Sequence, residues 1–213
     1  AQDKMASDTT TYSKTLIVAT AAFVAAASLG FLMHRALKSK RRLLPSSHIK
    51  VTVDLGQFVR NLRFIRERWL EAVSSNCLLC VVLKSNAYGH GIHTLAPLAI
   101  KTGANVLAIA TNEDAMAIRS ACGASVRVMR LRVATEEEVR YGLVHDLGVE
   151  EMVGCLNTAR ALSVLAHEHG TVLKVHLNID SGMGRMGFLV SETYDVQQVL
   201  KEYPDLEVVG ALT

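Results

Sequence analysis

Apolar and polar positions follow two different rhythms from residue 49 to the end of the chain. Short runs in which nearly every residue is apolar predict buried strands, and stretches with an apolar residue every three or four positions predict helices. The expected strands are 50–55, 77–83, 106–110, 125–131, 144–147, 172–179 and 206–212. The expected helices are 57–74, 92–102, 112–121, 135–141, 156–168 and 191–202. Strands that alternate with helices and are apolar on both faces are typical of parallel βαβ units covered by helices.

Two architectures are compatible with this alternation, an open doubly wound sheet and a (β/α)8 barrel. No P-loop sequence follows any expected strand, which weakens the case for a nucleotide-binding open sheet. The last expected strand, 206–212, has no helix after it, as in an interrupted barrel. The sequence therefore predicts an α/β fold, a partial (β/α)8 TIM-type barrel over residues 49–213.

The first 48 residues have a different character. Residues 15–33 contain no charged side chain and, as a helix, are long enough to cross the roughly 30 Å hydrocarbon core of a bilayer. Five basic residues follow between positions 35 and 42, which by the positive-inside rule keep the downstream part in the cytosol. The expected organisation is an N-terminal tail (1–14), a single transmembrane helix (15–37), a basic linker (38–48) and the barrel domain. A cleaved signal for export and an organellar targeting segment are the alternatives.

Composition narrows the class of protein. Half of the residues are apolar and 20% are charged, as in a globular domain. The net charge of +3 comes from the basic cluster, and aromatic residues make up only 5%, so a nucleic-acid-binding face is not expected. Cys77 and Cys80 have CxxC spacing but lie in an expected strand, where residues three apart point to opposite faces. We therefore expect buried thiols and no metal site.

One segment places a lysine where parallel α/β folds build their sites. Lys84 closes the apolar run of the sequence VVLKSNAYGHG, at the C-terminal end of an expected strand. A lysine buried there loses its proton more easily, and the neutral amine is the form that makes Schiff bases. Tyr88 offers a hydroxyl four residues later. The structural alternative is a lysine that reaches solvent beside an ordinary glycine turn.

A second segment, VHLNIDSGMGRMGF, ends the expected strand 172–179. His176, Asn178 and Asp180 share one face of that strand, and polar groups that point inward need partners. The glycines that follow would allow Arg185 to approach an anion, whose oxygens suit the guanidinium geometry. The structural alternative is an Asp–Arg pair in a glycine-rich turn.

Together the two segments resemble the cofactor-lysine and Gly-Met-Gly-Arg motifs of alanine racemases, which are fold-type III pyridoxal-phosphate enzymes. Residues 49–62 resemble the opening strand and helix of the family, and residues 208–213 resemble a further strand. The resemblance covers residues 49–213 and implies pyridoxal 5′-phosphate as cofactor. The activity it implies is the conversion of L-alanine to D-alanine, so the expected partner is a small amino-acid substrate.

The resemblance also implies roles for individual residues. Lys84 would hold the cofactor as a Schiff base and act as the base on one face of the substrate Cα. Tyr88 would contact the cofactor phosphate, and Arg185 the phenolic oxygen of the cofactor and the substrate carboxylate. Asn178 stands where many members have a carbamylated lysine, so a neutral amide would accept a hydrogen bond from Arg185. His176, on the same face of the strand, is expected to support this side of the site.

Racemisation needs a second base on the opposite face of the substrate. In the family this base is a tyrosine of a C-terminal β-domain, contributed across a dimer interface, and we expect a homodimer for the full-length protein. No residue of this sequence matches that tyrosine. The alternative function is therefore a truncated, non-catalytic module that binds pyridoxal phosphate or serves as a scaffold.

Overall fold

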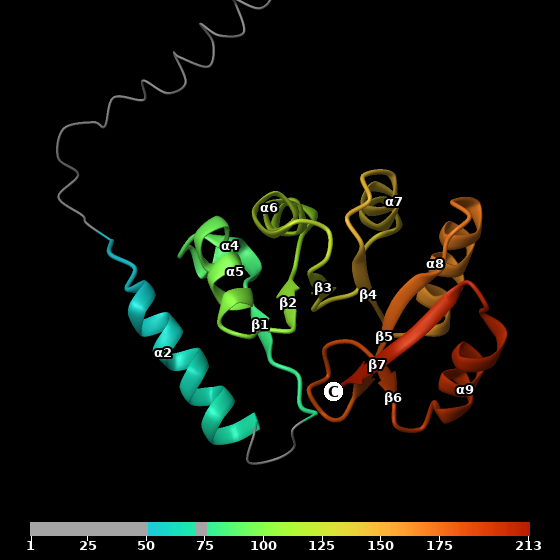
Figure 1. The fold of residues 1–213 in the computed structure, drawn as a ribbon. Helices are drawn as coiled ribbons and strands as arrows, with labels where there is room; N and C mark the ends of the chain where they lie inside the picture. Colours follow the sequence, from blue (N-terminus) through green and yellow to red (C-terminus); the bar gives the residue numbers. More distant parts are fainter. Residues whose placement is uncertain (1–50, 71–75) are drawn as a thin grey trace, which may run out of the picture. The chain divides into compact units, whose positions relative to one another are not determined.

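Seven strands pair into one sheet in residues 51–70 and 76–213, the part of the chain that the computed structural model describes (Figure 1). The strands are β1 (Cys80–Val82), β2 (Val106–Ile109), β3 (Arg127–Arg130), β4 (Val149–Val153), β5 (Leu173–Asp180), β6 (Phe188–Leu189) and β7 (Leu206–Leu212). They follow the order β1-β2-β3-β4-β5-β6, and β7 also pairs with β5. Every pairing is parallel, so the C-terminal ends of the strands lie at one edge of the sheet.

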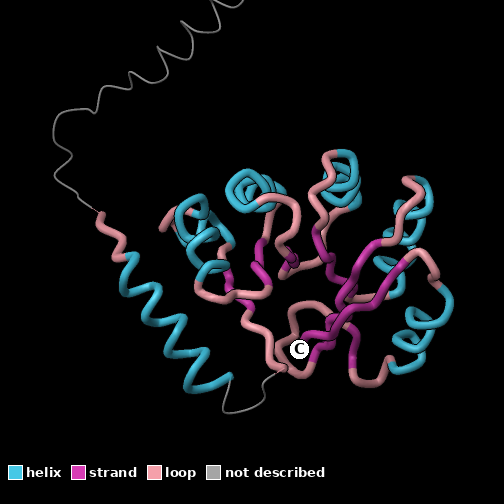
Figure 2. The backbone as a smooth tube through the Cα atoms, viewed as in Figure 1, coloured by secondary structure: helices cyan, strands magenta, loops and turns pink. Residues whose placement is uncertain are grey.

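The helices alternate with these strands. They are α2 (Leu55–Ile65), continued by the π-helix η1 (Arg66–Leu70), then α4 (Lys84–Tyr88), α5 (Ile92–Lys101), α6 (Asn112–Cys122), α7 (Glu136–Val144), α8 (Leu156–Glu168) and α9 (Thr193–Glu202). Figures 1 and 2 show α5, α6, α7 and α8 side by side along one face of the sheet. The predicted α/β fold of parallel strands covered by helices is confirmed.

Apolar side chains fill both faces of the strands. The face toward the helices carries two buried clusters, one centred on Leu107 and Val128 and the other on Val153 and Val175. On the opposite face, Met129 joins Val106 and Ala108 in a smaller buried cluster, and Leu131 and Leu212 pack against it. Strands that are apolar on both faces are therefore present, as the pattern predicted.

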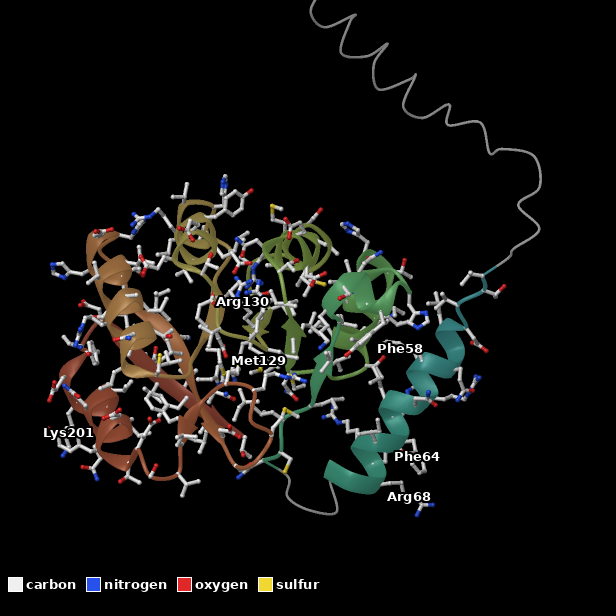
Figure 3. All side chains as sticks on the ribbon, turned by 180° about the vertical axis from the view of Figure 1, so that it is seen from behind. Phe58, Phe64, Arg68, Met129, Arg130 and Lys201 are labelled. Atoms are coloured by element: carbon white, nitrogen blue, oxygen red, sulfur yellow. The ribbon has the colours of Figure 1, made fainter. Side chains whose placement is uncertain are left out.

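A buried ion pair interrupts this apolar packing beside the helices. Arg130 follows Met129 on β3, and neighbouring residues of a strand point to opposite faces, so its side chain lies toward the helices (Figure 3). Its guanidinium donates to both carboxylate oxygens of Glu151, at 2.8 and 3.1 Å, and to Asn112 Oδ1 at 2.7 Å. Arg130 is completely buried, and Glu151 is 3% exposed. The pair ties β3 and β4 to the start of α6.

Two predicted strands were wrong. Residues 144–147 form no strand, because Val144 ends α7 and β4 begins at Val149. Residues 51–54 are not a strand either, because Asp54 caps α2 and accepts a hydrogen bond from the N–H of Gln57 at 2.8 Å. The helix predicted over 57–74 is described to residue 70, and 71–75 lie outside the described residues. Thr135 and Glu138 form a capping box at the start of α7.

The prediction of buried thiols was also wrong. The strand expected over 77–83 covers only Cys80–Val82, so Cys77 lies before it. Leu79 and Val81 take the buried positions, and both Cys77 and Cys80 are exposed free cysteines.

The prediction of a single-pass membrane protein is contradicted. In the two described stretches, 51–70 and 76–213, no helix combines the length and the apolar character needed to cross a bilayer. The segment that suggested such a helix, 15–37, lies outside the described residues together with the tail 1–14 and the linker 38–48. The membrane localisation is withdrawn.

Candidate functional site

Lys84 lies where the sequence predicted it, directly beyond the C-terminal end of β1. The N–H of Leu83 donates to the carbonyl of Ala108 at 2.8 Å, which continues the β1–β2 pairing up to the residue before the lysine. The Lys84 side chain is half-buried, and its Nζ lies 5.9 Å from the centroid of the Tyr88 ring. Tyr88 is 60% exposed, so its hydroxyl is open to a ligand at this edge.

The backbone after Lys84 turns in an unusual way. Ser85, Asn86, Ala87 and Tyr88 all have φ between 54° and 56°, so four successive residues with side chains form a left-handed turn. Each such residue costs about 1–2 kcal/mol relative to a right-handed one. The Ala87 methyl is buried in the core, and Asn86 Oδ1 accepts a hydrogen bond from the N–H of Ile92 at 2.8 Å. The left-handed turn therefore places the Tyr88 ring close to Lys84.

A buried carboxylate contacts this turn, and sequence reasoning missed its role. Asp114, in the first turn of α6, is only 6% exposed. Its oxygens accept hydrogen bonds from the N–H groups of Ser85 (3.1 Å) and Asn86 (3.0 Å), and from that of Ala110 (3.4 Å). Its contact with a turn 28 and 29 residues earlier in the chain left no local signal.

The second predicted segment also lies at the C-terminal edge of the sheet. The loop after β5 is held by Asp180, whose Oδ1 accepts hydrogen bonds from the N–H groups of Gly182 (2.9 Å) and Gly184 (3.0 Å). These two hydrogen bonds lower the pKa of Asp180 below its ordinary value, and the one from Gly184 has the larger effect. Arg185, one residue further, is exposed. The structural alternative of an Asp–Arg pair is not what forms, because Asp180 binds the loop backbone.

Asn178 differs from its expected contact. Its Nδ2 donates to the carbonyl of Met186 at 2.5 Å, so the amide holds the loop backbone next to Arg185 and makes no hydrogen bond to the guanidinium itself. The loop also packs tightly, because a Cβ at Gly187 would come within 2.6 Å of Asn178 Nδ2. Asn178 therefore fixes the path of the loop that presents Arg185.

His176 lies deeper in the strand and is buried, in a hydrogen-bonded network with Glu150 and Arg127. Its Nε2 lies 2.8 Å from Oε2 of Glu150, and Glu150 also accepts two hydrogen bonds from Arg127, at 2.7 and 2.9 Å. Burial raises the pKa of Glu150, but the hydrogen bonds from Arg127 and His176 outweigh it and hold that pKa below its usual value. His176 thus joins β5 to β4 and β3, and supports the strand from within.

The structure therefore gathers the predicted residues at one edge, in two groups. Lys84 and Tyr88 follow β1, Asn178 and Arg185 belong to the end of β5, and β2, β3 and β4 lie between them. In a parallel α/β fold this edge is where sites are built. Within the described residues, no group of three or more His, Cys, Asp or Glu side chains is placed to hold a metal ion.

A cavity of about 620 Å³ lies at the opposite edge, by the N-terminal ends of β3, β4 and β5. Its lining includes Arg127, Val149 and Lys174 but none of Lys84, Tyr88, Asn178 or Arg185. The Lys84 amine, the Tyr88 hydroxyl and the Arg185 guanidinium, in contrast, all lie at the other edge. We place the candidate site by its chemistry, at the C-terminal edge.

Comparison with known proteins gives concordant results. A family model described as the N-terminal domain of alanine racemase matches residues 53–213. A broad specificity amino-acid racemase of Vibrio parahaemolyticus is 34% identical over 173 residues, which are 80% of this chain and 41% of that protein. One from Pseudomonas putida is 35% identical over 171 residues, 79% of this chain and 40% of that protein.

Solved structures agree with these sequence relatives. Alanine racemase from Bacillus anthracis with bound L-Ala-P matches at a TM-score of 0.64 and 29% identity, over 75% of this chain and 39% of that one. The chain thus spans about two fifths of the length of the relatives it matches.

Proposed function

The chain belongs to the alanine racemase family, whose N-terminal domain it matches, and on this premise we propose that residues 49–213 are the cofactor-binding part of a pyridoxal 5′-phosphate-dependent amino-acid racemase. The observation that carries the proposal is Lys84 on its left-handed turn at the end of β1. That turn places an amine and a phenol at the edge where a parallel α/β fold binds ligands.

The residues at this edge fit the chemistry of the cofactor. Its aldehyde requires an amine, its phosphate requires hydrogen-bond donors, and its phenolic oxygen suits a guanidinium. Lys84 Nζ, the Tyr88 hydroxyl and the exposed Arg185 are the three corresponding groups. When bound, the cofactor supplies an electron sink for the negative charge left on the substrate Cα.

Each of these residues would then have its own role in the reaction. Lys84 Nζ would bind the cofactor aldehyde at rest, and during turnover would take the Cα proton from one face of the substrate and return it. Arg185 would hold the substrate carboxylate, and Asn178 would keep the Arg185 loop in place through Met186. Inversion of the substrate also requires a base on the other face. We propose that a partner subunit in a homodimer supplies it, as the family resemblance implies.

The neutral side chain of Asn178 affects which substrates Arg185 can bind. A neutral amide at position 178 places no negative charge beside the Arg185 guanidinium, which favours binding of the α-carboxylate shared by all amino acids. The relatives described above from Vibrio parahaemolyticus and Pseudomonas putida are named broad specificity racemases. We therefore propose alanine as a substrate within a wider range of amino acids.

Exchange of the Cα proton with solvent tests this function directly. The protein is incubated with pyridoxal phosphate and L-alanine in D2O, and loss of the Cα–H signal is followed by NMR. One base suffices for exchange, so the test does not depend on the base of the opposite face. We expect exchange with the parent protein and with Lys101→Arg, and none above the free-cofactor rate with Lys84→Arg. Equal exchange by the parent and Lys84→Arg contradicts the proposal. Cofactor binding without exchange favours the non-catalytic module.

A further inference from the structure

The left-handed turn after Lys84 needs something to hold it, because none of its four residues is glycine. Ser85, Asn86, Ala87 and Tyr88 would each favour a right-handed or extended conformation in isolation. Ser85 and Asn86 are exposed, so side-chain burial does not fix their backbone. What their backbones share is an acceptor, since the N–H groups of both donate to the Asp114 carboxylate.

We propose that Asp114 is a positioning residue for the cofactor lysine. Its carboxylate stabilises the left-handed turn by accepting hydrogen bonds from two successive N–H groups. The left-handed turn then directs Lys84 Nζ to the cofactor aldehyde. The inference rests on the proposed function. It adds that the attachment of cofactor depends on a side chain that never touches the cofactor.

The geometry suits a carboxylate in particular. Successive N–H groups in such a turn form a concave group of donors that favours an anion. Asp114 meets them with both oxygens, Oδ2 to Ser85 and Oδ1 to Asn86. A carboxylate only accepts hydrogen bonds, whereas an asparagine amide would offer one acceptor and one donor to two N–H groups. Because Asp114 is buried, water cannot easily replace its oxygens.

Asp114 is itself held in place by rigid elements. Its N–H donates to Oγ1 of Thr111, the residue that caps α6, at 3.3 Å. Oδ2 also accepts from the N–H of Ala110, directly after β2, at 3.4 Å. The carboxylate therefore links the turn after β1 to the connection between β2 and α6. Loss of the carboxylate is expected to release the turn while the core clusters stay packed.

Two readouts test the inference, and one of them does not require cofactor. The first is hydrogen–deuterium exchange of the Ser85 and Asn86 amides in the protein without cofactor, measured by NMR. The second is the dissociation constant of pyridoxal phosphate from an absorption titration. For Asp114→Asn we expect exchange at both amides about tenfold faster or more, and cofactor binding about tenfold weaker. Glu113→Gln removes the neighbouring acidic group, which is exposed, and is expected to change neither readout.

A rescue experiment separates positioning from a general loss of stability. Glycine adopts positive φ without steric cost, so Ser85→Gly in the Asp114→Asn background is expected to recover roughly threefold or more of the cofactor affinity. Ser85→Val tests the same turn with the carboxylate intact, because β-branched residues avoid positive φ. It is expected to weaken cofactor binding, and it replaces Asp114→Asn as the test if that variant does not fold.

The outcomes distinguish this inference from the proposed function. Parent-like amide exchange and affinity in Asp114→Asn, or parent-like affinity in Ser85→Val, overturn the inference even if Lys84 binds the cofactor. If the parent binds no pyridoxal phosphate, the proposed function and the cofactor role of Asp114 fall together. Faster exchange of Ser85 and Asn86 in Asp114→Asn would then still establish that the carboxylate holds the turn.

Discussion

Replacement of Gly187 by alanine is expected to displace the loop that carries Arg185. A Cβ at this position would lie 2.6 Å from Asn178 Nδ2, 2.7 Å from the Asn178 carbonyl oxygen and 2.9 Å from the Asp180 nitrogen. Two of these atoms belong to the backbone of β5, which pairs with β4, β6 and β7 and cannot easily move. The residue also has φ of +120°, a conformation that residues with side chains rarely adopt.

The magnitude follows from these two effects. Inserting a methyl group into a packed site costs about 1–3 kcal/mol, and a non-glycine residue in a sparsely populated backbone region costs about 1–3 kcal/mol. Gly187→Ala should therefore lower the free energy of unfolding by about 2–6 kcal/mol. That is a large part of the roughly 5–15 kcal/mol that stabilises a typical domain.

Gly184 provides a matched control in the same loop. Its φ is +64°, but a Cβ there would have no atom within 4 Å. Gly184→Ala therefore carries the backbone strain without the clash, and is expected to lower the free energy of unfolding by only about 1–2 kcal/mol. Urea unfolding of both variants, followed by circular dichroism, gives the two differences in free energy. If Gly187→Ala loses no more stability than Gly184→Ala, the packing of the Arg185 loop described above is wrong.

Two further predictions concern charged groups outside the site. Arg130→Met should lower the free energy of unfolding by about 3–5 kcal/mol, because it leaves the buried Glu151 carboxylate without its partner. The double variant Arg130→Met/Glu151→Leu should recover most of that loss in urea unfolding, and no recovery would contradict the assigned pairing. Hydrogen bonds from Arg132 lower the pKa of Glu138 from 4.5 to about 2. Because the folded-state pKa is the lower one, this stabilisation is complete above pH 4.5 and is lost as the pH falls toward 2. Glu138→Gln should therefore be less stable than the parent at pH 6 and equally stable near pH 2. A difference in melting temperature that stays constant over this range would refute the assignment.

The parts of the fold that local patterns specify were predictable. The apolar run around Val128 gives β3, and the spacing of Thr135 and Glu138 gives the start of α7. The positions of Lys84 and Arg185, beyond the C-terminal ends of β1 and β5, were predictable because each follows an apolar strand. In each case the signal lies within a few residues of the feature that it predicts.

The missed features depend on partners far along the chain. β4 contains Glu150 and Glu151, which break the apolar pattern and are tolerated because Arg127 and Arg130 on β3 neutralise them. The left-handed turn after Lys84 likewise depends on Asp114, in the helix after the next strand. Local periodicity carries no information on such pairings. The sequence therefore did not predict the buried charged residues of β4 or the strained backbone after Lys84.

The role of Lys84 is tested by the position at which pyridoxal phosphate becomes covalently attached. The protein is incubated with the cofactor and reduced with borohydride, and the labelled peptide is identified by mass spectrometry. Labelling confined to Lys84, and abolished in Lys84→Arg, is the predicted result. Label spread over exposed lysines such as Lys101 and Lys174, and unchanged in Lys84→Arg, would show that Lys84 is not the cofactor lysine.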